Sequence, residues 1–270
     1  MIRSANRINE RPDIQYGCPT PHGTRKTMSL RRVLATAGFL AIALTLPSAP
    51  AWAQDELEVK ITPIRHATFV MQFGDQTIIV DPVANADYTA FGEPDVILIT
   101  DVHPDHWNMD TVAMLMSTGT KVVAPEAVAD SWGGIDTVLD NEEMTDAEGI
   151  SIEAIAAYNI ERGPREGEFY HPEGRGNGYV VNLGFERIYI AGDTECTPEM
   201  KELEGISMAF IPMNLPYTMT PTEAAECVKT FKPKVVYPYH YRGSDVDVFA
   251  WRLEDTPEIE VRILDWYPGQ

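Results

Sequence analysis

The stretch that decides the fold runs from residue 95 to residue 106 and reads DVILITDVHPDH. Its first half, 95–100, is apolar and rich in β-branched residues, which predicts a buried strand. Its second half, 101–106, holds two histidines and two aspartates, and such groups are rarely buried without partners. A loop at the end of a buried strand holds polar side chains rigidly and open to solvent. The stretch therefore predicts a strand that leads into a metal-binding loop.

Three other predicted strands also end in polar residues. Asn159, Asp193 and His240 each follow an apolar run that is typical of a strand. Taken alone, Asp193 is explained as well by a turn, and His240 by a hydrogen-bonded core histidine. Side chains at successive strand ends converge on one rim of a sheet, however, and clefts form there. Considered with the 101–106 loop, these residues predict one metal site.

The rest of the sequence predicts an α+β fold with two sheets flanked by helices, because strands and helices are mixed and hairpins stand near the start of each half. The predicted strands are 57–64, 68–73, 77–81, 95–100, 121–124, 150–157, 178–182, 187–191, 208–211, 235–239 and 259–264. The predicted helices are 108–117, 126–130, 198–203, 221–231 and 246–253. No repeat or linker follows residue 54, so a single domain is expected over 54–270.

Residues 1–53 are predicted to be a leader and signal peptide, with Met28 as the true start. A positive segment and an apolar run from 33 to 46 precede Ala51-Trp52-Ala53, a typical cleavage site before Gln54. An uncleaved membrane anchor is the alternative. Arg31-Arg32 suggests twin-arginine export, although its flanking residues fit that signal poorly. The expected location is the periplasm or the medium, with no membrane contact after cleavage.

The charge balance excludes nucleic acid and anionic membranes as partners. The chain has a net charge of −20, and without residues 1–53, which hold seven basic and two acidic residues, the net charge is −25. A small-molecule substrate is the expected partner, and the sequence makes no prediction of the oligomeric state. Cys196 and Cys227 could pair in an oxidising compartment, or remain two buried thiols.

The order and spacing of five motifs resemble the metallo-β-lactamase superfamily, and within it the branch of L-ascorbate-6-phosphate lactonase and N-acyl-phosphatidylethanolamine phospholipase D. These motifs are His66-Ala67-Thr68-Phe69, Ile79-Val80-Asp81-Pro82, the 101–106 run, Ala191-Gly192-Asp193-Thr194 and Tyr239-His240. The resemblance covers nearly all of 57–270. It implies a four-layer αβ/βα sandwich with metals at one edge of its two sheets.

Two residues depart from the pattern of that family. The motif is His-x-His-x-Asp-His, whereas this chain begins it with Asp101, and the family's third histidine falls at or near Asn159. By resemblance, both departures affect one metal, whose ligands would be Asp101, His103, Asn159 and Asp193. The other metal keeps its full set, which is Asp105, His106, Asp193 and His240. His171 is an alternative to Asn159 and ranks below it.

The donor chemistry predicts two unequal metals. Carboxylate and amide oxygens in place of imidazole nitrogens favour Mn²⁺, Mg²⁺ or Ca²⁺, whereas the complete set suits Zn²⁺, Fe²⁺ or Mn²⁺. We therefore expect one firm site and one weaker or harder site.

The expected activity is metal-dependent hydrolysis, because a divalent metal lowers the pKa of bound water. Asp105 and Asp193 are the expected catalytic residues: Asp105 orients the water, and Asp193 lies between the metals. His66 and Asp81 are expected to support the ligands from behind, without binding metal.

The expected substrate is a small anionic ester, lactone or phosphodiester. His171, Arg175 and Arg242 are the candidate substrate-binding residues, since an arginine fork suits phosphate or carboxylate. Surface arginines that offset an acidic chain explain the two arginines equally well. The alternative function is an exported metal- or ligand-binding protein without turnover, and a redox iron enzyme ranks last.

Overall fold

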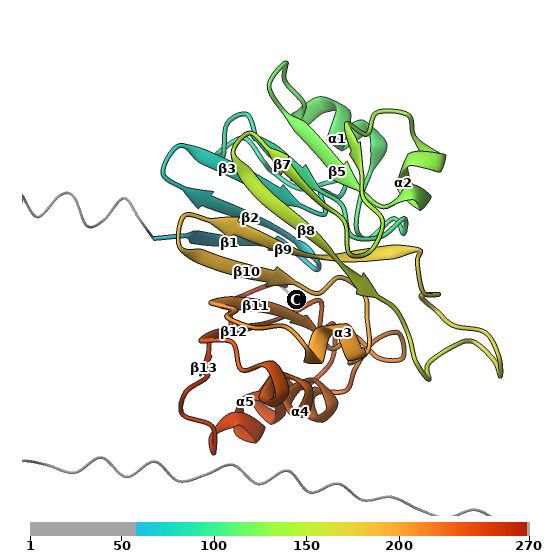
Figure 1. Ribbon diagram of the computed structural model, residues 1–270, viewed down its shortest axis with the longest axis vertical. Coiled ribbons are helices and arrows are strands. Elements are labelled where there is room, and N and C mark those ends of the chain that lie inside the picture. The colour runs from blue at the N-terminus through green and yellow to red at the C-terminus, as the bar shows by residue number, and fades with distance from the viewer. Residues whose placement is uncertain (1–57, 269–270) are drawn as a thin grey trace, which may run out of the picture. The chain divides into compact units, whose positions relative to one another are not determined.

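The computed structural model describes residues 58–268, which form thirteen strands and five helices (Figure 1). The predicted leader, signal peptide and cleavage site lie outside the described residues. The strands form two sheets, with the orders β1-β2-β3-β4-β5-β6 and β13-β12-β11-β10-β9-β8-β7. Among residues 58–268, no helix combines the length and the apolar composition needed to cross a membrane.

The first sheet begins as an antiparallel meander, β1–β3, and continues as four parallel strands, β3–β6. Two helices make its later crossovers, α1 (Met109–Leu115) and α2 (Glu126–Ser131). Asn108 caps α1 by accepting the amide hydrogen of Thr111, as its position in the sequence predicts. The strands are β1 (Lys60–Arg65), β2 (Thr68–Phe73), β3 (Gln76–Val80), β4 (Val96–Leu98), β5 (Lys121–Ala124) and β6 (Thr137–Val138).

The second sheet repeats this plan, with antiparallel strands β7–β10 followed by parallel strands β10–β13. Its strands are β7 (Met144–Ala147), β8 (Ile150–Ala157), β9 (Gly176–Leu183), β10 (Glu186–Ile190), β11 (Met208–Pro212), β12 (Val235–Tyr239) and β13 (Glu260–Val261). Its helices are α3 (Pro198–Lys201), α4 (Pro221–Phe231) and α5 (Val246–Leu253). Since half of each sheet is parallel, the α/β class describes the fold better than the predicted α+β class.

Most predicted elements agree with the structure to within a few residues. Helix α4 begins where predicted because Pro221 occupies its first position and Thr220 forms a capping box with Glu223. Strands β6 and β7 were not predicted, because they are short and partly polar. The disulfide between Cys196 and Cys227 resolves the open question about these residues, and it ties the segment after Asp193 to α4.

The layers follow the order helix, sheet, sheet, helix, as the resemblance implies (Figure 1). Between the sheets, Phe69 stacks on Phe210 with ring centroids 4.3 Å apart, and Trp266 packs edge-on against both. On the outer faces, Val112 and Val128 of α1 and α2 pack against the first sheet, and Val228 of α4 packs against the second.

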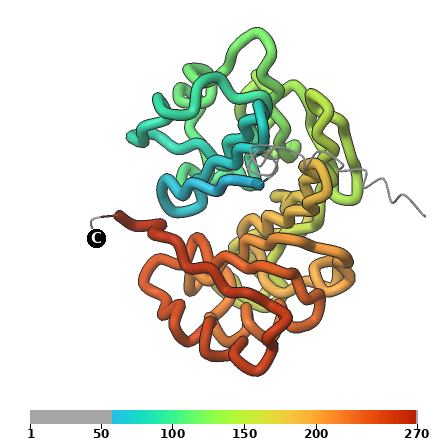
Figure 2. Tube along the Cα trace, turned by 90° about the vertical axis from the view of Figure 1, so that its left-hand side faces the viewer, coloured from blue at the N-terminus to red at the C-terminus, as the bar shows by residue number. Residues whose placement is uncertain are grey.

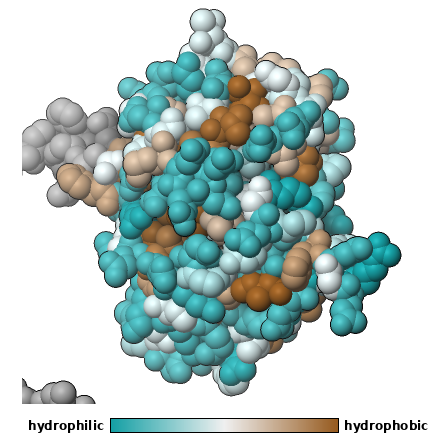
Figure 3. All heavy atoms as spheres, turned by 45° about the vertical axis from the view of Figure 1, so that its right-hand side comes forward, coloured by the Kyte–Doolittle hydropathy of each residue, from teal (hydrophilic) through white to brown (hydrophobic). Residues whose placement is uncertain are grey.

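Figure 2 shows the cyan-to-green first half of the described chain beside the orange-to-red second half. The face in Figure 3 is mainly hydrophilic, with hydrophobic side chains in small separate groups, in keeping with 41 acidic residues in the sequence.

Strand direction brings the polar loops together. In the first sheet β1, β3 and β4 point the same way, and in the second sheet β8, β10, β11 and β12 do. The loops after these strands therefore leave each sheet at one edge.

Candidate metal centre

Every histidine among residues 58–268 lies at this edge; the sixth histidine of the chain, His22, precedes the described residues. Three groups offer ligand atoms within 4.8 Å of one another, and the first two share His240. The groups are His66, Asp105 and His240; His106, Asp193 and His240; and Asp101, His103 and His171. We call the members of the first two groups the core set and those of the third the loop set.

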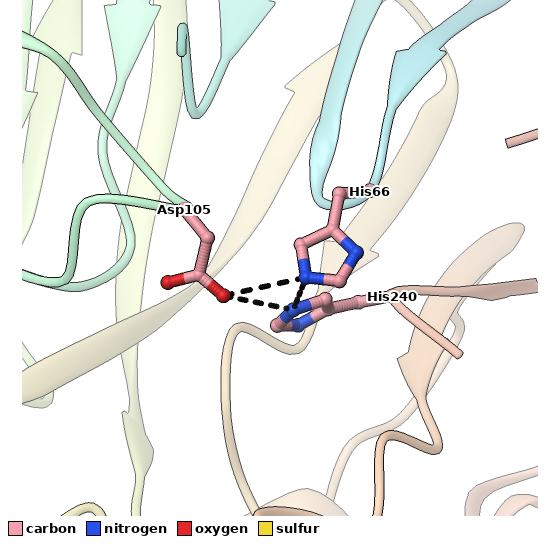
Figure 4. Close-up of side chains that lie close together, drawn as sticks. All are labelled: His66, Asp105 and His240. Carbon is pink, nitrogen blue, oxygen red and sulfur yellow. Dashed lines mark hydrogen bonds and ion pairs between the residues drawn. The ribbon is translucent and has the colours of Figure 1, made fainter. Parts of the chain in front are cut away.

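In the core set, histidines surround the carboxylates of Asp105 and Asp193. Asp193 lies with Oδ2 3.3 Å from His106 Nε2 and with Oδ1 2.6 Å from His240 Nδ1. Asp105 Oδ2 lies 3.3 Å from His66 Nε2 and 3.5 Å from His240 Nε2, as Figure 4 shows. The two Nε2 atoms of His66 and His240 are 2.7 Å apart. Loops after three strands, β1, β4 and β12, thus supply the three side chains in Figure 4.

In three histidines, Nδ1 lies within hydrogen-bond distance of a side-chain oxygen atom. His106 Nδ1 lies 2.8 Å from Asp81 Oδ2, His66 Nδ1 2.8 Å from the Tyr267 hydroxyl, and His171 Nδ1 2.8 Å from Asn159 Oδ1. Ionised carboxylate and amide oxygens accept hydrogen bonds and do not donate them, so His106 and His171 carry a proton on Nδ1 and direct Nε2 towards Asp193.

His106 Nε2 shows that a cation fits the core set. This atom is buried and faces Asp193 Oδ2 at 3.3 Å, but it forms no hydrogen bond of acceptable geometry among the described residues. An unpaired buried nitrogen is costly, and a metal ion would satisfy it. The donors, imidazole nitrogens and carboxylate oxygens, are those that Zn²⁺, Fe²⁺ and Mn²⁺ accept.

The loop set is built around Asp101. His103 Nδ1 lies 2.7 Å from Asp101 Oδ2, while His171 Nε2 lies 3.9 Å from the same oxygen and 3.1 Å from Asp193 Oδ2. Arg175 donates a hydrogen bond from Nη2 to Asp101 Oδ2 over 3.1 Å. The guanidinium of this predicted substrate-binding residue is therefore engaged with a candidate metal ligand.

Asn159 faces His171 and not the carboxylates. Its Oδ1 accepts the backbone N–H of His171 at 2.7 Å and also faces the ring, while its Nδ2 donates to the Tyr217 carbonyl at 2.8 Å. The structure thus places the His171 ring, and not the Asn159 amide, beside Asp101 and Asp193. Asn159 orients this histidine.

Glu195 holds the loop that carries Asn159 and His171. Its buried carboxylate accepts the backbone N–H groups of Ile160, Glu161 and Arg162, at 2.5, 2.7 and 3.4 Å, and pairs with the Arg162 guanidinium. Glu195 stands two residues after Asp193, so one segment supplies both a candidate ligand and the anchor of the loop.

Three residues of the centre have left-handed backbone conformations. The φ angles are 61° at His66, 49° at Asp81 and 44° at His240. Such angles cost non-glycine residues roughly 1–3 kcal/mol and cluster at functional sites. The turns that aim these side chains are therefore maintained by the surrounding structure.

Burial and charge set the protonation of the core set. Burial lowers the pKa of His66 to about 4, although Asp105 opposes this shift, so the ring is neutral near pH 7. Burial would raise the pKa of Asp193, but His240 and His106 outweigh it and hold that pKa well below its usual range. These forms of His66 and Asp193 bind metals. Burial would lower the pKa of His106 and of His240, but Asp193 outweighs it and raises both, so a metal that binds there must displace protons.

Two cavities adjoin the core set. The larger, of about 500 Å³, is lined by His66, Asp105, Tyr170, Asn214, Leu215, Tyr217, Arg242 and other residues. The smaller, of about 250 Å³, is lined by Arg65, Asn85 and others, and shares His66, Pro104, Asp105 and Arg242 with the larger one.

Sequence reasoning gave His66 the wrong place in the centre. We expected His66 to support ligands from behind, whereas its Nε2 faces Asp105 among the candidate ligand atoms. The available signal was its position directly after a strand, which it shares with His240. Asp81 lies behind His106, in hydrogen-bond contact with its Nδ1.

Comparison with known proteins agrees with this geometry. The beta-lactamase superfamily domain matches residues 60–240. A UPF0173 metal-dependent hydrolase of Thermococcus onnurineus is 34% identical over 219 residues, covering 74% of this chain and 95% of the relative. Another, of Pyrococcus abyssi, is 32% identical over 222 residues, covering 75% and 96%.

Solved structures show the same fold. A protein of Parabacteroides distasonis that is assigned by name as a metal-dependent hydrolase is 39% identical to this chain, with a TM-score of 0.72. The match covers 77% of this chain and 94% of that one. Igni18, a metallo hydrolase of Ignicoccus hospitalis, has 23% identity and a TM-score of 0.63, covering 78% and 96%, and is similar in fold alone.

The fold and the donor set together define a metal-dependent hydrolase with the metallo-β-lactamase fold. The chain belongs to the beta-lactamase superfamily, among the UPF0173 metal-dependent hydrolases. The finer branch that includes ascorbate-6-phosphate lactonase stays a prediction.

Proposed function

We propose that this hydrolase acts on a small anionic ester, lactone or phosphodiester and uses two unequal metal sites. The observation that carries the proposal is the arrangement of His66, His106 and His171. Each Nδ1 is held by an oxygen atom, and each Nε2 faces a carboxylate of the centre. Ligands oriented in advance favour metal binding.

The core set would hold Zn²⁺, Fe²⁺ or Mn²⁺, and the loop set would hold Mn²⁺, Mg²⁺ or Ca²⁺ more weakly. Asp101 supports this difference, because Arg175 already occupies one of its oxygens. Asp193 would serve both sets, since its Oδ2 lies within 3.3 Å of His106 and 3.1 Å of His171.

A divalent ion in the core set would supply acidified water and polarisation of the substrate. Asp105 would orient the attacking water and take up its proton, since its side chain is 47% exposed and lines both cavities. Burial would raise the pKa of Asp105, but hydrogen bonds from His240 and His66 outweigh it and keep the carboxylate ionised. Asn214, 3.4 Å from His240 Nε2, would offer its amide to the substrate.

Export to the periplasm or the medium remains part of the proposal. The signal-like segment before Gln54 motivates it. The Cys196–Cys227 disulfide supports it, because disulfides persist mainly in oxidising compartments.

The test is metal content and turnover of the mature chain, residues 54–270. Elemental analysis should find about one tightly held metal and a second that dialysis removes. A panel of esters, lactones and phosphodiesters should reveal hydrolysis that Asp105→Ala abolishes while thermal unfolding stays cooperative. Asp130→Ala, which removes an exposed carboxylate on α2, is the matched control. Two equally tight zinc ions, or turnover that survives Asp105→Ala, would contradict the proposal.

A further inference from the structure

We propose that Arg65 and Arg242 form an anion subsite beside the core set, which binds a carboxylate or phosphate group of the substrate. The larger cavity would take the apolar remainder, so that the bond to be hydrolysed lies near Asp105. This inference rests on the proposed function and names the substrate class more narrowly.

The position of the subsite follows from the two cavities. The smaller cavity is lined by Arg65 and Arg242, together with His66 and Asp105 of the core set. Arg242, His66 and Asp105 also line the larger cavity. A group bound between the arginines is therefore next to the candidate metal ligands.

The two arginines stand out in this acidic chain. The sequence has 41 acidic and 21 basic residues, yet neither guanidinium forms an ion pair with a carboxylate among residues 58–268. Five other arginines do pair with carboxylates, including Arg162 with Glu195 and Arg187 with Glu153. Two exposed arginines at one cavity give a local positive potential that attracts an oxyanion.

The backbone fixes both arginines relative to the core set. Arg65 ends β1, directly before His66. The backbone N–H of Arg242 donates to the Tyr267 hydroxyl at 2.8 Å, and the same hydroxyl lies 2.8 Å from His66 Nδ1. The anion would therefore be bound at a set distance from the reacting bond, as efficient hydrolysis requires.

The larger cavity has an apolar wall. Tyr170 and Tyr217 meet edge to face with ring centroids 5.0 Å apart, and the side chains of Leu215 and Tyr217 are about half exposed beside them. Such a wall suits an aromatic or aliphatic group.

In the reaction, water oxygen forms a bond to the acyl carbon, the ester C–O bond breaks, and the released alcohol takes a proton.

The experiment compares 4-nitrophenyl succinate, which carries a carboxylate, with the neutral 4-nitrophenyl butyrate, using the zinc-loaded mature chain. Arg65→Gln and Arg242→Gln should each lower the succinate-to-butyrate ratio of kcat/KM about 10-fold. The control is Arg252→Gln, which also removes one positive charge but lies on α5, over Trp251. It should leave the ratio unchanged. Equal ratios in all three variants would overturn the subsite.

A binding measurement separates this proposal from the proposed function. Calorimetry with phenylphosphonate and with phenylacetate should show binding that both arginine variants weaken about 10-fold, and the stronger ligand tells phosphate from carboxylate. Weakened binding without hydrolysis of either ester would support the subsite and contradict the hydrolysis of small esters. If the esters are hydrolysed but the arginine variants bind phenylphosphonate as tightly as the parent chain, the result supports ester hydrolysis and contradicts the subsite.

Discussion

The core set and the loop set contain similar donors but are held differently. The core histidines follow β1, β4 and β12, and each is at most 5% exposed. In the loop set, the His103 side chain is 40% exposed, and His171 comes from the long segment between β8 and β9. A ligand that is ordered before the metal arrives loses less conformational entropy on binding. The comparison therefore indicates that metal affinity follows the scaffold as well as the donor type.

The largest effect should come from removing a core ligand. His106→Ala should lower kcat/KM more than about 100-fold, since even the residues behind metal ligands contribute about 10–100-fold. His103→Ala should reduce activity less and leave the tightly held metal in place. Steady-state kinetics and elemental analysis measure both. If His103→Ala strips both metals while His106→Ala keeps them, the ranking of the two sets is reversed.

A smaller effect is expected behind the loop set. Asn159→Ala leaves His171 Nδ1 without its acceptor, so the weaker metal should bind about 10–100-fold less tightly, with the tight metal unaffected. Titration with Mn²⁺ after dialysis measures this. If Asn159 were itself the ligand, His171→Ala would leave the weaker metal bound, and that result would contradict our assignment.

Loosening the segment 159–171, which Glu195 holds in place, should affect the loop set and leave the core set unchanged. Glu195→Ala removes the acceptor of three backbone N–H groups and should cost about 1–3 kcal/mol of unfolding free energy. Amide exchange at residues 160–162 should speed up, and the weaker metal should be lost first. Glu161→Ala, which removes an exposed neighbouring carboxylate, should change neither quantity.

The smallest effect concerns acid stability. Burial would raise the pKa of Glu223, but the Arg162 guanidinium outweighs it and lowers that pKa. The pair therefore stabilises the fold at neutral pH, and the gain disappears as the pH falls below about 4.3 towards the lowered value. Because the pair is partly exposed, the loss is below about 1 kcal/mol. Glu223→Gln should show a smaller drop in Tm between pH 6 and pH 3 than the parent chain, and equal drops would contradict this role.

The sequence predicted the residues of the centre better than their orientation. The 101–106 loop, Asp193 and His240 could be located because each follows an apolar run whose strand period is local information. Helix α4 was predicted with its observed bounds for the same kind of reason, since Pro221 suits the first turn of a helix.

The choice between Asn159 and His171 could not be made locally. It depends on the path of the segment between them, which Glu195 fixes from a distance of more than thirty residues in sequence. Arg175 is a similar case, since its contact with Asp101 spans 74 positions. Such long-range contacts leave no periodic trace in the sequence.

The left-handed turns at His66, Asp81 and His240 have a consequence for engineering. Glycine adopts these angles without steric cost, so substitution by glycine at such a turn relieves strain even as it deletes a functional side chain. A library of this chain screened only for heat resistance would therefore enrich inactive variants at these positions. At these three positions, selection for thermal tolerance favours glycine, whereas selection for turnover favours the functional side chain.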